Sequence, residues 1–99
     1  MDPAKPDINN IHISDVVVST AGRDTGDWFY VIAEDPIYLF LANGKDRTLD
    51  KPKRKKRKHV QKVLRSETRV AGKLRTADKV LNGELLRDLA FLARENASE

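Results

Sequence analysis

The chain contains no cysteine, and among its 99 residues it has only two histidines, one tryptophan, two tyrosines and three phenylalanines. Without cysteine it can form neither a disulfide, nor a thiolate metal site, nor a cysteine nucleophile. His12 and His59 stand far apart, with no carboxylate spacing typical of ligation, so we expect no metal site and no histidine base. No apolar run approaches the ~20 residues of a membrane-spanning helix. Residues 1–10 also lack the basic and apolar parts of a secretory signal, and we expect a cytoplasmic protein that uses no membrane.

The length excludes several classes of enzyme as well. Ninety-nine residues correspond to one small domain with one core. A domain of this size rarely forms the cleft that acid–base catalysis or a small-molecule substrate requires. The sequence contains no phosphate-binding P-loop and no nucleophile–base pair. We therefore expect neither catalytic activity nor a cofactor.

Charge is distributed unevenly along the chain. Residues 1–50 hold four basic and nine acidic residues, a net charge of −5, whereas residues 51–99 hold fifteen basic and six acidic residues, a net charge of +9. From Lys51 to Arg65 there are nine Lys and Arg residues and no carboxylate. Such a cluster repels itself unless an anionic polymer or surface is near, so the sequence favours a polyanionic partner.

The hydrophobic pattern indicates mainly strands. Residues 1–12, with Pro3 and Pro6, are expected to form a disordered arm whose isoleucines pack on the domain at its end. Runs of β-branched and aromatic residues predict strands over 15–20, 28–33 and 37–42. Asn43-Gly44 predicts a type I′ turn into a short polar strand within 45–49, and 59–64 suits a last short strand or a turn of helix.

The C-terminal part, residues 65–99, is weakly patterned except at its end. Residues 82–95 predict an amphipathic helix that begins at an Asn82 N-cap and places Leu85, Leu89 and Leu92 on one face. Short strands joined by glycine-bearing turns favour a small barrel over residues 13–64, and the helix would cover it. The predicted fold class is therefore mainly β, a small barrel with an appended C-terminal α-helix.

One segment resembles a known family. Residues 16–26, VVVSTAGRDTG, continue to Val31-Ile32 and resemble a KOW motif, with Gly26 at the motif's glycine and Val31 at its later apolar position. Together with the basic exit KPKRKKRKH, residues 14–63 are similar to KOW-domain RNA-binding proteins related to the large-subunit ribosomal protein numbered fourteen in the archaeal and eukaryotic series. Asp27 departs from the pattern, because many members carry a basic residue there. The resemblance implies an SH3-like barrel, no catalysis, and attachment to ribosomal RNA in translation.

The residues support RNA binding at two places. The loop glycines let backbone N–H groups approach a phosphate beside Arg23, although they also suit a simple turn, and Asp24 is expected to organise the loop by accepting backbone amides. The run from 51 to 62 is expected to be an extended strap that contacts phosphates, the alternative being a solvated tether. The expected RNA-binding residues are Gly22, Arg23, Gly26, Lys45, Arg47, Lys51, Lys53, Arg54, Lys55, Lys56, Arg57, Lys58, His59 and Lys62.

The aromatic residues of the second predicted strand have two interpretations. Phe29 and Val31 are expected in the core, so Trp28 and Tyr30 face outward. They then either stack on unpaired bases or pack beneath the C-terminal helix, and packing is favoured because that helix needs an apolar partner. The same two interpretations apply to Tyr38 and Phe40.

Two functions remain in view. The first is a non-catalytic RNA-binding protein that docks on ribosomal RNA or another structured RNA as a ribosomal or ribosome-associated protein. The second is a protein-interaction adaptor in transcription or translation, which binds a partner such as a ribosomal protein through the barrel or through the C-terminal helix. Binding that survives nuclease treatment would favour the adaptor.

Overall fold

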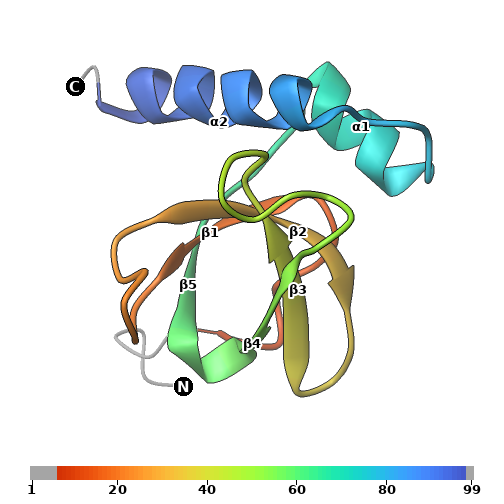
Figure 1. The fold of residues 1–99 in the computed structure, drawn as a ribbon. Coiled ribbons are helices and arrows are strands. Elements are labelled where there is room, and N and C mark those ends of the chain that lie inside the picture. Colours follow the sequence, from red (N-terminus) through yellow and green to blue (C-terminus); the bar gives the residue numbers. More distant parts are fainter. Residues whose placement is uncertain (1–6, 98–99) are drawn as a thin grey trace.

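Five antiparallel strands form one curved sheet in the computed structural model, which describes residues 7–97 (Figure 1). The strands are β1 (Asp15–Ser19), β2 (Trp28–Glu34), β3 (Tyr38–Ala42), β4 (Lys53–Lys56) and β5 (Val60–Arg65), in the order β4-β3-β2-β1-β5. The two edge strands, β4 and β5, follow one another in the chain and are joined only by the 3₁₀ turn η1 (Arg57–His59). This short link keeps the two edges near each other, so the sheet curls. The observed fold is thus mainly β with a C-terminal helix, as predicted.

The concave face of the sheet holds one core. Strand alternation directs Val17, Phe29, Val31, Leu39 and Leu41 to this face, where they form a buried cluster with Ile11 and Val60. Phe29 and Val31 therefore lie in the core, as the pattern predicts.

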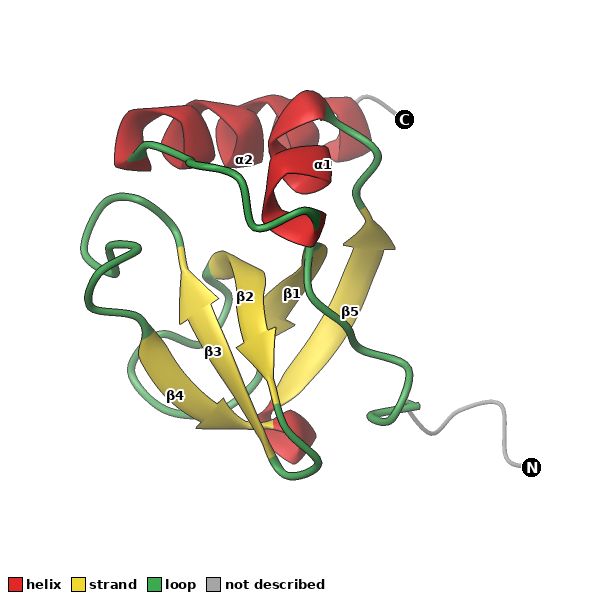
Figure 2. Ribbon diagram, turned by 90° about the vertical axis from the view of Figure 1, so that its right-hand side faces the viewer, coloured by secondary structure: helices red, strands yellow, loops and turns green. Residues whose placement is uncertain are grey.

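The other face of the sheet packs against two helices, α1 (Arg69–Arg75) and α2 (Asn82–Ala97), which lie together over one end of it (Figures 1 and 2). Leu85, Leu89 and Leu92 of α2 form a second buried cluster with residues of β1 and β2, including Val16 and Tyr30. The expected apolar stripe of this helix is confirmed, and it is used within the chain itself.

Polar contacts join α2 to the sheet inside this second core. The Tyr30 hydroxyl donates to the Asp88 carboxylate and lies 2.8 Å from Ser66 Oγ. Thr68 Oγ1 donates to the same Asp88 oxygen at 2.8 Å. Burial and the Asp88 carboxylate raise the pKa of Tyr30 to about 12, so the phenol keeps its proton and remains a donor at neutral pH.

The predicted polar strand at 45–49 does not form. Asn43 does not adopt the positive φ that a type I′ turn requires at both central residues; only Gly44 does, at 81°. Asn43 Oδ1 instead accepts the backbone N–H groups of Lys45 and Arg47, at 2.9 and 3.0 Å. The chain therefore makes a longer connection, and the strand that pairs with β3 begins later, at Lys53.

The C-terminal part differs from the prediction in two details. Helix α1 lies in the segment described as weakly patterned, and its first turn is capped by Thr68 Oγ1, which accepts the Ala71 N–H at 3.2 Å. Asn82 is not the cap of α2. Its Oδ1 accepts the Leu49 N–H at 2.8 Å, whereas Glu84 reaches back to the Leu81 N–H at 3.1 Å.

The end of the predicted N-terminal arm packs on the domain through its isoleucines, as expected. Ile11 is 1% exposed, and the carbonyls of Ile8 and Ile11 each accept a hydrogen bond from Arg57 at 2.9 Å. The rest of the predicted arm, residues 1–6, lies outside the described residues. Within residues 7–97, neither helix has the length and apolar character needed to cross a membrane.

Candidate nucleic-acid interface

Strand β4 divides the basic run into two sets by simple alternation. Successive side chains of a strand point to opposite faces, so Lys53 and Lys55 point one way and Arg54 and Lys56 the other. The inward set reaches the polar edge of the concave core, where both lysines pair with one acidic residue of the first half of the chain. The outward set faces solvent.

Asp24, in the β1–β2 loop, pairs with both inward lysines. Its two carboxylate oxygens accept hydrogen bonds from Lys53 Nζ and Lys55 Nζ, each at 2.6 Å. Lys55 is only 7% exposed and also donates to Ser19 Oγ and to the Ala21 carbonyl, at 2.7 and 2.6 Å. Burial alone would raise the pKa of Asp24, but the hydrogen bonds from these lysines and from Ser19 hold it well below its usual range.

Asp24 therefore organises the loop, as expected, but through side chains. The structure gives its carboxylate no backbone amide, and its partners come from β4 and from Ser19 at the end of β1. The contact ties the glycine-bearing loop to the basic strand. Two sequence features predicted separately are thus joined at one place.

Arg57 is held in the same way by the other end of the sheet. It is 6% exposed, and its guanidinium donates to the Asp35 carbonyl at 2.8 Å and to Glu34 Oε1 at 3.3 Å, besides the two carbonyls of the N-terminal segment. Burial would raise the pKa of Glu34, but hydrogen bonds from the Ile13 N–H and His12, together with the charge of Arg57, lower it. The Arg57 N–H groups that make these hydrogen bonds are therefore engaged inside the protein.

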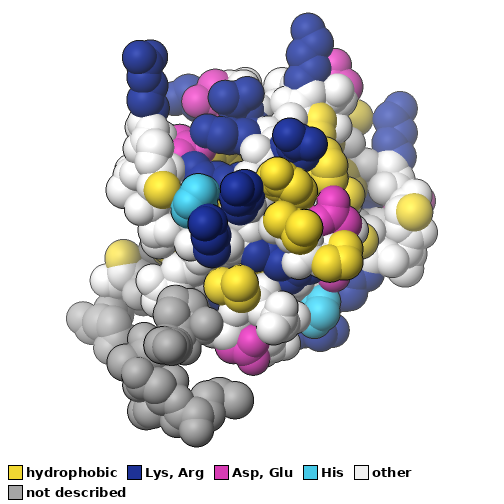
Figure 3. All heavy atoms as spheres, turned by 90° about the horizontal axis from the view of Figure 1, so that it is seen from below, with side chains coloured by type: hydrophobic (Ala, Val, Ile, Leu, Met, Phe, Trp, Pro, Cys, Tyr) yellow, Lys and Arg dark blue, Asp and Glu magenta, His cyan; other side chains and the backbone are white. Residues whose placement is uncertain are grey.

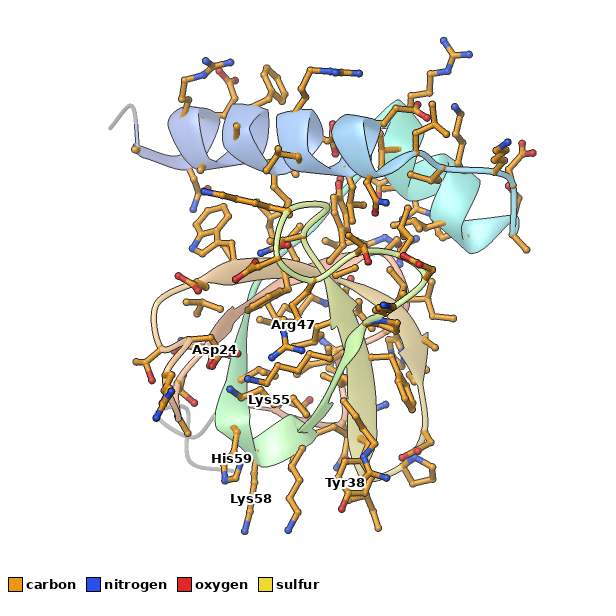
Figure 4. All side chains as sticks on the ribbon, viewed as in Figure 1. Asp24, Tyr38, Arg47, Lys55, Lys58 and His59 are labelled. Carbon is orange, nitrogen blue, oxygen red and sulfur yellow. The ribbon has the colours of Figure 1, made fainter. Side chains whose placement is uncertain are left out.

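The outward set is differently placed. Arg54, Lys56 and Lys58 are exposed and make no ion pair with any residue in 7–97. The Arg54 guanidinium lies over the Tyr38 ring, with Cζ 4.4 Å from the ring centroid. Lys58 and His59 extend from η1 at the end of the molecule opposite the helices, and Tyr38 lies at that same end (Figure 4).

Tyr38, Arg54, Lys56 and His59 border one open hollow of about 380 Å³, which we call the basic hollow, and Lys58 is not part of its lining. Its lining brings together the β1–β2 loop, the start of β3, and β4 with η1: Ala21, Gly22, Tyr38, Lys53, Arg54, Lys55, Lys56 and His59. Seen from the end away from the helices, Lys and Arg side chains gather beside a histidine and a group of hydrophobic side chains (Figure 3).

No protein-family model matches this chain, and no curated protein matches it either. The geometry of the basic hollow therefore carries the functional argument.

The loop residues of the predicted site lie at or near this hollow. Gly22 lines it with a φ of 89°, and a side chain there would stand in the left-handed region. Arg23 and Gly26 are exposed in the same loop, and Gly26 also has a positive φ, of 92°. Gly26 N–H donates to the Ser19 carbonyl at 2.8 Å, so that amide is used to close the loop.

Several other predicted contacts lie elsewhere. Lys62 pairs with the buried Asp15 at 3.2 Å and donates to the Asn10 carbonyl at 3.2 Å, near β5. Lys45 lines a second hollow, of about 340 Å³, beneath α2. Arg47 and Lys51 are exposed in the β3–β4 connection and outside the basic hollow.

Neither aromatic residue proposed for base stacking lies in the basic hollow. Tyr30 has no exposed surface and donates to Asp88, so it cannot stack on a base. Trp28 is half-buried, packs against the cluster under α2, and lines the second hollow together with Asp27 and Asp46. The favoured interpretation, packing beneath the helix, is confirmed for both.

Tyr38 does lie at the basic hollow. The sequence predicts that its ring either packs or stacks, and in the structure it lines the hollow beside Arg54. Its position follows from the pairing of β3 with β4, in which Tyr38 lies opposite Lys56 and diagonal to Arg54. All four residues of β4 are basic, so the sequence has no hydrophobic alternation there that would predict the strand with which β4 pairs.

Chemically, this arrangement offers exposed cations, a glycine backbone and one aromatic ring. It suits an anionic polymer whose backbone meets the cations while another part meets the ring. Within residues 7–97, no group of three or more histidines, aspartates or glutamates is placed to hold a metal ion.

Proposed function

We propose that this chain is a non-catalytic RNA-binding protein that docks on structured RNA, ribosomal RNA in the first instance, through the basic hollow. The observation that carries the proposal is the division of strand β4. Lys53 and Lys55 both pair with Asp24, whereas Arg54, Lys56 and Lys58 are exposed and make no ion pair within residues 7–97. Arg54 and Lys56 line the basic hollow, and Lys58 lies in the turn η1 that follows β4. Such a set of cations favours a polyanion, because each phosphate they neutralise releases a counterion.

The finer fold assignment belongs to the same proposal. We infer that the sheet is the SH3-like barrel of a KOW domain. The return of β5 to pair with β1 and the single 3₁₀ turn between β4 and β5 support it, as does the glycine loop at the position where residues 16–26 resemble the motif.

The adaptor alternative offers two surfaces to a partner, the barrel and the C-terminal helix. The apolar stripe of the helix is used within the chain, because Leu85, Leu89 and Leu92 are buried against the chain's own sheet. A protein partner would therefore bind through the barrel.

The test removes the exposed cations and leaves the internal ones. In the triple variant Arg54→Ser, Lys56→Ser, Lys58→Ser, every ion pair of Asp24 and Glu34 remains. We expect weaker binding to a labelled, folded ribosomal RNA transcript, and a salt dependence (log K against log salt) that is shallower by about 2–3, at ~0.7–0.9 per lost phosphate contact. Fluorescence anisotropy at several salt concentrations measures both.

A matched variant controls for net charge. Lys79→Ser, Arg87→Ser, Arg94→Ser removes three exposed cations from the helical end of the molecule and should leave the salt dependence unchanged. Equal loss in the two variants would mean that net charge alone drives binding, and unchanged binding in both would reject the hollow as the contact. A pull-down of a protein partner that survives nuclease treatment would point to the adaptor instead.

A further inference from the structure

Tyr38 and Arg54 form a stacked pair of planar groups that lines the basic hollow, and we call this pair the Tyr38–Arg54 surface. Tyr38 and Arg54 come from neighbouring strands, and their side chains lie on the outward face of the β3–β4 ladder. The guanidinium lies over the ring at 4.4 Å, a cation–π contact that orients both groups. Aromatic rings and Arg guanidinium planes are the two protein groups on which nucleobases stack.

The surroundings suit a single nucleotide. Lys56 and His59 line the hollow beside this surface and supply donors for a phosphate. Gly22 lines it from the loop, where an added Cβ would have only Asp24 Oδ1 and Lys55 Nζ within 4 Å, each at 3.7 Å. The backbone there is accessible to a close approach.

Of the aromatic residues within 7–97, Tyr38 is the one that lines the basic hollow. Phe29 and Tyr30 are buried in the two cores. The hollow beside Trp28 contains the carboxylates of Asp27 and Asp46, which would repel a phosphate. Tyr38 is the aromatic residue that combines access with positive charge.

We propose that the basic hollow takes an unpaired nucleotide, so that the RNA recognised carries a bulge or an open loop and is not a continuous duplex. The base stacks on the Tyr38–Arg54 surface while Lys56 and His59 contact the adjoining phosphates. A base inside a continuous A-form helix stays in its stack and cannot reach this surface. The inference rests on the proposed RNA binding and specifies the kind of RNA.

The experiment compares two labelled RNA hairpins of equal length, one fully paired and one with a single bulged adenosine. For the wild-type protein we expect the bulged hairpin to bind roughly 5- to 150-fold more tightly, the range for one stacked base. Tyr38→Leu should reduce this preference to less than about 2-fold while its binding to the paired hairpin stays within about 2-fold of wild type. Tyr38→Phe, which keeps the ring, should retain the preference.

A second measurement does not depend on any variant. With 2-aminopurine at the bulge, stacking on the wild-type protein should quench the fluorescence of that base. Phe91→Leu, which removes an exposed aromatic ring on α2, controls for loss of an aromatic residue and should keep both the preference and the quenching.

The outcomes separate the two proposals. Equal binding of the paired and bulged hairpins by the wild type, or a preference that Tyr38→Leu leaves intact, overturns the unpaired-nucleotide site while RNA binding stands. Failure of the wild type to bind either hairpin in low salt overturns the proposed function, and this inference with it.

Discussion

Replacing Asp24 by asparagine tests whether the first half of the chain stabilises the basic strand of the second. The substitution keeps the size and one acceptor oxygen of the side chain but removes its charge. Lys53 is 27% exposed and can be hydrated, so its lost partner should matter little, ~0–1 kcal/mol. Lys55 is 7% exposed and cannot be hydrated without opening the loop, so most of the cost falls there.

The magnitude follows from what Lys55 retains. Removing one partner of a fully buried ion pair costs ~3–5 kcal/mol. Lys55 keeps Ser19 Oγ and the Ala21 carbonyl as acceptors, which lowers the cost. We therefore expect Asp24→Asn to lower the free energy of unfolding by ~2–3 kcal/mol. For a domain of this size the midpoint of thermal unfolding should fall by ~10–20 °C.

The dependence on pH gives a second readout. The pKa of Asp24 in the folded protein lies below its value in the unfolded chain, so the unfolded state binds more protons in acid. The stabilising contribution of Asp24 is thus present above a pH of ~4 and is lost as the pH falls through the folded-state pKa. Asp24→Asn should lose less stability between pH 5 and pH 2 than the wild type, with the remaining loss coming partly from Glu34.

Urea unfolding followed by the fluorescence of the single tryptophan, Trp28, measures these quantities. Asp27→Asn is the matched control, because Asp27 lies in the same loop, is exposed, and makes no ion pair with the described residues. Its effect should stay within ~0.5 kcal/mol. If Asp24→Asn is equally neutral, or if its acid sensitivity equals that of the wild type, the carboxylate does not hold the strand.

Three further substitutions test the packing of the helices and the connection. Tyr30→Phe removes the hydroxyl bonded to Asp88 and should cost ~1–3 kcal/mol in urea unfolding, since it leaves a part-buried carboxylate with one fewer donor. Gly44→Ala should cost more than about 3 kcal/mol, because a Cβ there would lie 2.2 Å from the Asn82 carbonyl oxygen and the residue has a φ of 81°. Gly72→Ala, inside α1 with nothing within 4 Å, should be neutral or stabilise the protein by up to ~1 kcal/mol.

Tyr30→Phe and Gly44→Ala each have a comparison variant. Tyr38→Phe removes a hydroxyl at the surface and should be near neutral in stability, so an equal loss in Tyr30→Phe and Tyr38→Phe would contradict the role of the buried network. Gly26→Ala has a similar positive φ, of 92°, but open space around the new methyl group. If it costs as much as Gly44→Ala, the approach of α2 to the connection is not the cause.

Local chemistry determined much of this protein from the sequence alone. The strands β1, β2 and β3 were predictable because β-branched and aromatic residues alternate between two buried faces. The apolar stripe of α2 was predictable because its leucines recur at helical spacing. The acidic first half and the basic second half were evident as well, and so was the expectation of a polyanionic partner.

The tertiary structure decided how the basic run is used. Lys53, Arg54, Lys55 and Lys56 are chemically alike, so no pattern in the sequence distinguishes the inward from the outward pair. That distinction depends on Asp24, which lies about thirty residues earlier in the chain and meets β4 only after the sheet has formed. Pairing of β3 with β4 likewise brought Tyr38 beside Arg54, because contacts between strands depend on register, which residues distant in sequence set together.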